Sequence, residues 1–364
     1  MITFESVTKR YPGGTVAVDD LDLTVEAHSL TVFVGPSGCG KTTSMRMINA
    51  MVAPTSGTVT VNGRAVADTD AVELRRGIGY VIQGAGLLPH RTVVDNVATV
   101  PVLRGESRRT ARRAALEVLE RVGLDLALAG RYPAQLSGGQ QQRVGVARAL
   151  AADPPILLMD EPFSAVDPVV RADLQAEMRR LQADLRKTIV FVTHDIDEAV
   201  TLGDRVAVFG PHGRLQQHAD PRTVLASPAT DFVAAFVGRD RGYRGLSFRT
   251  ADEVPLSEIR TVTRAQVPGL HVGSGEWVLV VGDTGAPVGW IGADGMHPGG
   301  SVFPVGGDLR QALDSAISSP SGTGVAVDDS GRVVGGIDAT QVIAALAEQR
   351  RTEMRGGTDG GRPL

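Results

Sequence analysis

The sequence predicts an α/β fold with a buried, mostly parallel sheet, followed by a smaller second domain of strands and helices. Three apolar runs, at 30–34, 156–159 and 188–193, are continuous rather than alternating, which is typical of parallel strands covered on both faces. Residues 90–150 show a helical pattern instead. Beyond a predicted boundary at 238–250, lysines are absent, glycines are frequent and the apolar strands are short.

Composition excludes several classes of protein. With 364 residues the chain is long enough for more than one core. Its net charge of −4 shows no basic excess, so we expect no nucleic-acid partner. No apolar run reaches the roughly 18 residues of a membrane span, and the first residues lack an export pattern. Cys39 is the only cysteine, so no internal disulfide is possible. We therefore expect a reduced, cytoplasmic protein.

The first elements are predicted from local patterns. Residues 1–30 alternate between apolar and polar positions and turn at 11–14, which indicates antiparallel strands. The strand at 30–34 runs into a glycine-rich loop, and 42–50 is predicted to be the helix that follows. Residues 59–61 lead into Asn62-Gly63, a dipeptide typical of β-hairpins.

The glycine-rich loop is predicted to bind phosphate, because it matches G-x-x-x-x-G-K-[ST] between a strand and a helix. Its backbone N–H groups and the helix N-terminus favour phosphate oxygens. Lys41 is expected at the β- and γ-phosphates and the Thr42 hydroxyl at Mg²⁺. Cys39 is interpreted as a small side chain in a tight turn rather than a redox group. The predicted nucleotide-binding residues here are Gly35, Pro36, Ser37, Gly38, Cys39, Gly40, Lys41, Thr42 and Thr43.

Two adjacent carboxylates follow the apolar run at 156–159. Asp160, at the strand end, is the candidate Mg²⁺ ligand, and Glu161 is the candidate general base that polarises the attacking water. The alternative for such a pair is a solvated turn. The buried run before the pair and Pro162 after it disfavour that alternative.

Three further positions are ambiguous in isolation. Gln83 follows an apolar segment and would reach Mg²⁺ or the attacking water, although a lone glutamine is commonly a surface amide. His194 follows the run at 188–193 and suits a γ-phosphate sensor, whereas a lone histidine is usually structural. Tyr11 either stacks on adenine or packs against the protein.

A second phosphate-binding device is predicted where Ser137, Gly138, Gly139 and Gln140 begin a helix. One nucleotide site needs only one phosphate-binding loop. Two devices in one chain are useful if two copies pair head to tail and each completes the site of the other. We therefore expect a homodimer.

Together, residues 1–240 resemble the ATP-binding subunits of ABC transporters. The order of the motifs carries the resemblance: the loop at 35–42, then the motif at 136–140, then the strand and carboxylates at 156–161. Residues 164–168 resemble the D-loop of that family, which adds Asp167 to the nucleotide-binding residues. The resemblance implies a P-loop NTPase with a RecA-like core, an antiparallel β subdomain and a helical subdomain at about 90–150. It implies ATP and Mg²⁺ as cofactors.

More specific stretches, at 80–90, 136–162, 191–199 and 236–241, resemble the ATPase subunits of osmoprotectant importers. Such importers carry glycine betaine, choline, carnitine or proline. The resemblance implies integral membrane permease subunits and an extracytoplasmic substrate-binding protein as partners, and a location at the cytoplasmic face of the plasma membrane. The alternatives are an importer for another small polar solute, such as amino acids, and a soluble ABC ATPase without a permease. One departure is Gly84, where relatives often have glutamine.

The second domain, predicted at 250–348, carries an internal duplication. Residues 277–291 form a strand, a turn and a strand, and 324–337 repeat the pattern. This region resembles a shortened, degenerate pair of CBS motifs, in which the first repeat lacks much of a helix between 260 and 276. Its role is either regulation or mere dimerisation and stabilisation. Helices are predicted at 309–318 and 339–348, and the tail at 349–364 is predicted to be disordered.

Overall fold

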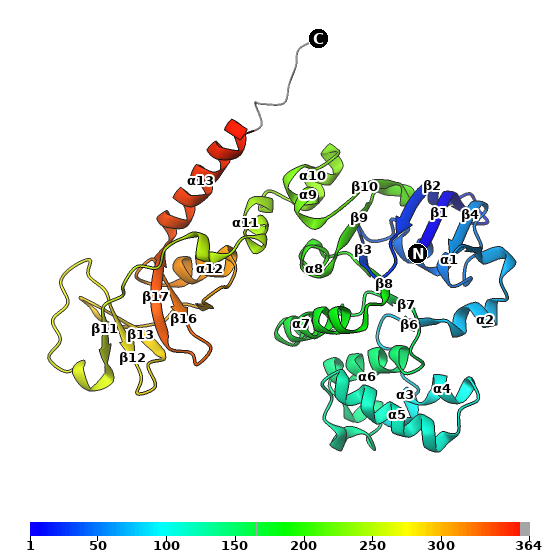
Figure 1. The fold of residues 1–364 in the computed structure, drawn as a ribbon, viewed down its shortest axis with the longest axis horizontal. Coiled ribbons are helices and arrows are strands. Elements are labelled where there is room, and N and C mark those ends of the chain that lie inside the picture. The colour runs from blue at the N-terminus through cyan, green and yellow to red at the C-terminus, as the bar shows by residue number, and fades with distance from the viewer. Residues whose placement is uncertain (165, 357–364) are drawn as a thin grey trace, which may run out of the picture. The chain divides into compact units, whose positions relative to one another are not determined.

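The computed structural model describes residues 1–164 and 166–356, and the chain divides into two compact units after Arg239 (Figure 1). This division lies at one end of the boundary region that the sequence indicated. Within the described residues, no helix is both long and apolar enough to cross a bilayer.

The first unit is built on a six-stranded sheet that is parallel except at one edge. The three predicted apolar runs form central neighbouring strands, and almost all of their side chains are buried. Because parallel strands share one carboxyl edge, the residues that follow them meet there. In spatial order the strands are β10 (Leu215–Ala219), β9 (Arg205–Phe209), β3 (Leu30–Val34), β8 (Thr188–Thr193), β7 (Ile156–Asp160) and β6 (Ile78–Val81).

A four-stranded antiparallel sheet packs against this core, as predicted from the alternating N-terminal pattern. Phe33 of the parallel sheet contacts Phe4 of the antiparallel sheet with ring centroids 6.5 Å apart, and both belong to one buried cluster. The predicted hairpin turns through Asn62 and Gly63, both of which have positive φ angles. The strands are β2 (Val16–Val25), β1 (Ile2–Arg10), β4 (Ser56–Val61) and β5 (Arg64–Ala65).

Helices complete the first unit, and four of them lie at 93–150, where the helical subdomain was expected. In α5 (Arg108–Arg121) the arginines are exposed, whereas Ala111, Ala115, Val118 and Leu119 are buried, which is the amphipathic pattern of a surface helix. The other helices are α1 (Lys41–Ile48), α2 (Ala71–Arg76), α3 (Val93–Val97), α4 (Thr99–Leu103), α6 (Gly138–Leu150), α7 (Pro168–Leu185), α8 (Ile196–Leu202), α9 (Pro221–Ala226) and α10 (Asp231–Val237).

The second unit contains the predicted duplication as two sets of three strands. In each set the first strand pairs parallel with the second, and the second pairs antiparallel with the third. The first set is β11 (Thr261–Thr263), β12 (Val278–Val281) and β13 (Pro287–Gly292), extended by β14 (Gly295–Pro298). The second set is β15 (Val302–Pro304), β16 (Thr323–Val327) and β17 (Val333–Asp338).

The two repeats differ in their helices. The second repeat has α12 (Leu309–Ser318) between its first two strands and α13 (Ala339–Gly356) after its third. At the corresponding place in the first repeat, the described chain forms only the single 3₁₀ turn Arg264–Gln266. A short helix, α11 (Arg241–Gly245), precedes both repeats. The missing helix agrees with the shortened first repeat, while the assignment to CBS motifs stays a prediction.

The predicted start of the disordered tail, at residue 349, is wrong. Helix α13 continues to Gly356, because residues 340–355 are rich in alanine, glutamine, glutamate and arginine, which favour helix, and no glycine occurs before 356. Residues 357–364 of the predicted tail lie outside the described residues.

Candidate nucleotide site

The phosphate-binding loop lies between β3 and α1, and two of its glycines are required by close backbone approach. Gly35 has φ +154°, and a Cβ there would lie 2.2 Å from the carbonyl oxygen of Phe209. Gly40 has φ +105°, and a Cβ there would lie 2.1 Å from the carbonyl oxygen of Ala17. No side chain fits at these distances. The loop is therefore pressed against the β-sheet framework at both ends.

Lys41 occupies the inside of the loop. Its ammonium donates hydrogen bonds of 2.8 Å to the carbonyl oxygens of Gly35 and of Pro36, and only 4% of the residue is exposed. Its Nζ lies 3.7 Å from Sγ of Cys39. Burial raises the pKa of the Cys39 thiol, and the nearby ammonium only partly offsets this. The interpretation of Cys39 as a small buried side chain agrees with this environment.

Thr42 and Asp160 face each other across the loop. The Thr42 hydroxyl donates a 2.8 Å hydrogen bond to Oδ1 of Asp160. The other carboxylate oxygen lies 3.6 Å from an Arg46 nitrogen and accepts a 3.5 Å hydrogen bond from the Tyr80 hydroxyl. Sequence reasoning missed Arg46 and gave Tyr80 no role. The spacing of Arg46 four residues after Thr42, on one helix face, was the available signal for the first.

Glu161 lies between the other two predicted catalytic residues. Its Oε2 accepts a 3.4 Å hydrogen bond from the Gln83 amide, and its Oε1 lies 3.3 Å from Nδ1 of His194. These residues follow β6, β7 and β8, so the shared carboxyl edge of the sheet brings them together. The structure thus assembles the predicted catalytic set from three distant parts of the chain.

The backbone of Glu161 adopts a strained conformation that aims this carboxylate. Its φ of +44° is unusual for a residue with a side chain. Two contacts hold it: its N–H donates to the carbonyl oxygen of Val192 at 3.0 Å, and its own carbonyl oxygen accepts from the Ser164 hydroxyl at 2.9 Å. Ser164 is a supporting residue that the sequence did not single out.

The oxygen atoms of Thr42 and Asp160 fit Mg²⁺, which prefers hard oxygen ligands and usually keeps several waters and phosphate oxygens. Gln83, the third predicted metal ligand, is hydrogen-bonded to Glu161 instead. No group of three or more histidine, cysteine or acidic side chains that could hold a metal occurs among the described residues.

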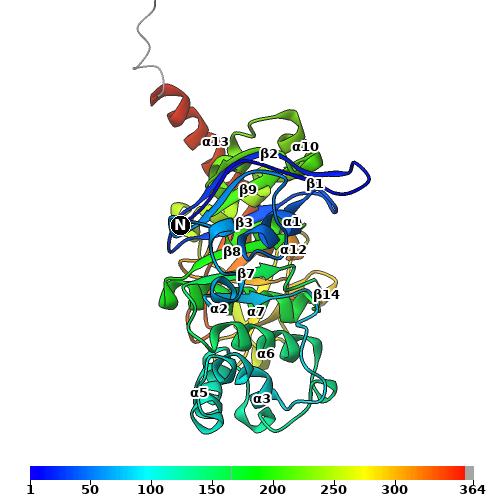
Figure 2. The ribbon, with the colours of Figure 1, turned by 90° about the vertical axis from the view of Figure 1, so that its right-hand side faces the viewer.

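The second phosphate-binding device is well formed and open. Ser137 caps α6: its hydroxyl accepts from the Gln140 N–H at 3.3 Å, and the Gln140 side chain accepts from the Ser137 N–H at 2.9 Å. Ser137 and Gly138 are exposed, Gln140 is half-buried and Gly139 is buried. Figures 1 and 2 show α6 apart from α1, with the edge of the sheet at β6 and β7 between them. Within one chain, therefore, this device does not meet the phosphate-binding loop.

Two predicted nucleotide contacts lie at the surface. Tyr11 is 39% exposed, and its ring faces the ammonium of Lys9 at 5.1 Å rather than a hydrophobic core. Asp167 is exposed directly before α7. Ala165, which belongs to the predicted D-loop, lies outside the described residues. The roles of Tyr11 and Asp167 stay predictions.

Sequence reasoning missed Arg148, which ties α6 to the segment after Gln83. The half-buried guanidinium donates to the carbonyl oxygens of Gly86 at 2.7 Å and Ala85 at 2.8 Å, and burial lowers its pKa. Gly84, Ala85 and Gly86 all have positive φ, which explains why glycine suits position 84. Only tertiary contact reveals this brace, so no local sequence signal could have found it.

Comparison with known proteins agrees with this geometry. The family model for ABC transporters matches residues 18–164. The osmoprotectant import ATP-binding protein OsmV of Salmonella typhimurium is 40% identical, over 96% of this chain and 97% of its own length. The chain therefore belongs to the ABC transporter family as an ATP-binding protein, and it carries the ATPase fold and site of that family.

A further relative and a solved structure are also similar to this chain. The glycine betaine uptake system ATP-binding protein YehX of Escherichia coli K12 is 49% identical, over 71% of this chain and 84% of its own length. The solved dimer of the ATP-binding cassette MJ0796 with ADP and phosphate is 34% identical with a TM-score of 0.56, over 61% of this chain and 99% of that one. The resemblance to osmoprotectant ATP-binding proteins is thereby confirmed.

Proposed function

We propose that this chain is the ATP-hydrolysing subunit of an importer for quaternary ammonium osmoprotectants. The observation that carries the proposal is the meeting of Gln83, Glu161 and His194 beside the phosphate-binding loop. The cargo class rests on the names of the relatives, one an osmoprotectant importer and one a glycine betaine system. The nucleotide-binding unit holds the chemistry, so cargo choice belongs to other subunits.

The side chains divide the reaction between them. Lys41 exchanges its two carbonyl partners for the β- and γ-phosphate oxygens of ATP. Thr42 and Asp160 would hold Mg²⁺, which supplies positive charge to the phosphates. Glu161 accepts the proton of the attacking water as it bonds to the γ-phosphorus, while the bond to the leaving ADP oxygen breaks. Gln83 and His194 orient Glu161 and the water.

We propose a homodimer as the working form. Ser137 and Gly138 are exposed and Gln140 is half-buried at a helix N-terminus, a setting that favours anions, yet they lie apart from the loop in their own chain. A second copy placed head to tail brings this device to the other copy's γ-phosphate. The solved dimeric cassette supports the arrangement by likeness.

We propose that the permease docks on a groove of the helical part, close in sequence to Gln83. The groove has a volume of about 300 Å³ and mixes polar and charged side chains, among them Arg91, Asp95, Arg112 and Tyr132. Arg112 lies 3.5 Å from Asp95, so one wall is an ion pair that a partner can rearrange. A permease bound here would hold the chain at the cytoplasmic face of the membrane. Delivery from outside would need an extracytoplasmic substrate-binding protein.

Reconstitution tests the proposal. The chain is purified with the permease encoded beside it, and ATP hydrolysis is measured in vesicles with the substrate-binding protein, with and without glycine betaine. We expect glycine betaine to stimulate hydrolysis, and Glu161→Gln to abolish it while ATP still binds. Glu117→Gln, on the exposed face of α5, is the matched control and should change nothing.

The possible outcomes test the ATPase assignment and the class of transported solute separately. Hydrolysis that is lost in Glu161→Gln but indifferent to glycine betaine keeps the ATPase assignment and rejects the cargo class. Full hydrolysis in Glu161→Gln rejects the catalytic assignment.

A further inference from the structure

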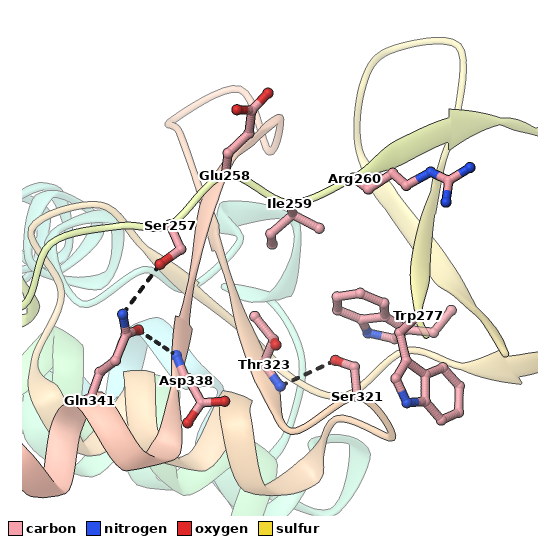
Figure 3. A pocket seen from close by; sticks show the side chains of 10 residues that line it. Ser257, Glu258, Ile259, Arg260, Trp277, Ser321, Thr323, Asp338 and Gln341 are labelled. Atoms are coloured by element: carbon pink, nitrogen blue, oxygen red, sulfur yellow. Dashed lines mark hydrogen bonds between the residues drawn. The ribbon is translucent and has the colours of Figure 1, made fainter. Parts of the chain in front are cut away.

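A cleft in the second unit lies between its two repeats (Figure 3). Its volume of about 310 Å³ is at the lower end of small-molecule sites. Both tryptophans of the whole chain, Trp277 and Trp290, line it. Trp290 is 2% exposed and belongs to the core beneath, while the partly exposed Trp277 packs edge-on against His297 with centroids 5.2 Å apart. The aromatic part of the cleft is therefore held in place by its neighbours.

The opposite wall is fixed by hydrogen bonds that join the repeats. The Gln341 side chain accepts from the Asp338 N–H at 2.9 Å and donates to the Ser257 hydroxyl at 3.3 Å. Ser257 and Gly336 also exchange backbone hydrogen bonds of 2.8 and 2.9 Å. Preformed walls lower the ordering cost of binding a ligand.

The charges of the lining are arranged in two ends. Figure 3 shows Arg260 on the Trp277 side of the cleft and Asp338 on the Gln341 side. The Arg260 backbone is fixed by a 3.0 Å hydrogen bond from the Leu279 N–H, but its guanidinium makes no hydrogen bond or ion pair with the described residues. Glu258 and Asp338 outnumber this one cation, which disfavours a polyphosphate in the cleft.

We propose that this cleft binds a small zwitterion that carries both a quaternary ammonium group and a carboxylate, such as glycine betaine. The face of the partly exposed Trp277 attracts the ammonium, which cannot donate a hydrogen bond, and Arg260 pairs with the carboxylate. The inference rests on the proposed function, since such a solute is what the importer would deliver to this side of the membrane. Binding would let the chain sense the solute already imported.

Intrinsic tryptophan fluorescence of the full-length chain tests the proposal, because both tryptophans line the cleft and the cassette has none. Without permease, glycine betaine should give a saturable change. Tetramethylammonium should bind roughly tenfold more weakly, because it lacks the carboxylate that Arg260 pairs with, and acetate should not bind. AMP should compete poorly. The absence of a saturable signal, confirmed by titration calorimetry, or tighter binding of AMP than of glycine betaine, would overturn the proposal.

Variants of Arg260 and Trp277 test the two proposed ligand contacts separately. Arg260→Gln should weaken glycine betaine about tenfold and leave tetramethylammonium unchanged, because only the carboxylate contact is lost. Trp277→Leu should weaken both ligands, with Trp290 as the remaining reporter, and Trp277→Phe, which keeps an aromatic face, should restore part of the binding. An equal loss for both ligands in Arg260→Gln contradicts the proposed orientation.

The failure of this proposal is distinguishable from failure of the proposed function. A chain whose hydrolysis is stimulated by glycine betaine in vesicles but whose tryptophans do not respond loses only the cleft assignment. A chain that responds in fluorescence without stimulated hydrolysis keeps the cleft and loses the cargo class.

Discussion

At the scale of single residues, the site depends on how each charge is held before nucleotide arrives. Lys41 is buried with two carbonyl oxygens as partners, so its compact ammonium is desolvated and already positioned. The planar guanidinium of an arginine would not fit in the space that this compact ammonium occupies. Glu161, by contrast, is half-buried and held by its strained backbone between Gln83 and His194. Lys41 is thus positioned to bind phosphate, and Glu161 is positioned to accept a proton from water.

The Cys39 thiol gives a direct probe of the loop. Burial raises its pKa, so little thiolate exists near neutral pH and N-ethylmaleimide should react slowly, with a rate that climbs as the pH rises toward 9 and above. ATP should slow the reaction further, and the modified protein should lose ATP binding because the adduct fills the loop. Mass spectrometry measures the modification and nucleotide titration the binding.

The matched control is Cys39→Ser, which removes the only thiol and should show neither modification nor loss of ATP binding. Complete modification with ATP binding intact would show that the thiol lies outside the nucleotide site.

The predicted site residues that the structure brings together belong to short motifs. Lys41 and Thr42 follow from a local spacing that phosphate chemistry requires, and Asp160 follows from its position after a buried strand. Arg46 and Tyr80, which surround that aspartate, depend on helix and strand packing that a linear pattern does not encode. Gln83, which is expected to reach Mg²⁺ or the attacking water, donates a hydrogen bond to Glu161, and its contact with the metal stays a prediction.

At the scale of elements, α6 has two ends with different tasks. Its first turn presents Ser137 and the following glycines, and near its last turn Arg148 binds the carbonyl oxygens of Ala85 and Gly86. A Cβ on Gly145 would lie 3.2 Å from the Ala85 side chain, so helix and segment are in close contact. We therefore expect a movement of α6 to shift the segment that follows Gln83.

Replacing Arg148 tests this link. Arg148→Gln removes charge-assisted hydrogen bonds to the carbonyl groups of Ala85 and Gly86, so we expect a loss of about 1–3 kcal/mol in the free energy of unfolding. Because the segment after Gln83 is then released, glycine betaine should stimulate hydrolysis about tenfold less, with ATP affinity unchanged. Chemical denaturation and the vesicle assay provide the two measurements.

Arg143→Gln separates stability from coupling. Arg143 lies on the same helix and donates 2.8 Å to the carbonyl oxygen of Val122, away from Gln83. It should lower stability to a similar or smaller extent and leave stimulation intact. If both variants lose stimulation equally, the effect comes from general loosening of α6 and the proposed link is wrong.

Most elements were predictable because apolar residues recur with different spacings in helices, in half-buried strands and in fully buried strands. The continuous runs became the central parallel strands, and the arginine-faced segment became α5. The length of α13 was not predicted, because the glycine-rich end of the chain was taken as the start of the tail although the preceding residues favour helix. The placement of the two strand sets around one cleft could not be predicted, because it depends on tertiary structure.

At the scale of the whole molecule, the two units have separate hydrophobic cores. One buried cluster spans residues 2–209, and two others lie within 246–342. A unit with its own core is expected to unfold cooperatively by itself. The nucleotide site draws all its residues from the first unit, and the tryptophan cleft draws all of its lining from the second.

Calorimetry of the full-length chain should therefore show two unfolding transitions that respond to different ligands. A non-hydrolysable ATP analogue at about 100 times its Kd should stabilise the first unit by about 2.7 kcal/mol and raise only that transition. Glycine betaine should raise only the transition that tryptophan fluorescence reports, since both tryptophans belong to the second unit. Lys41→Ala should abolish the shift caused by the ATP analogue and spare the other, and Arg260→Gln should reduce the shift caused by glycine betaine and spare the first. A single transition whose temperature both ligands raise equally would mean that the two units unfold together. Nucleotide and solute would then both increase the same free energy of unfolding, that of the whole chain.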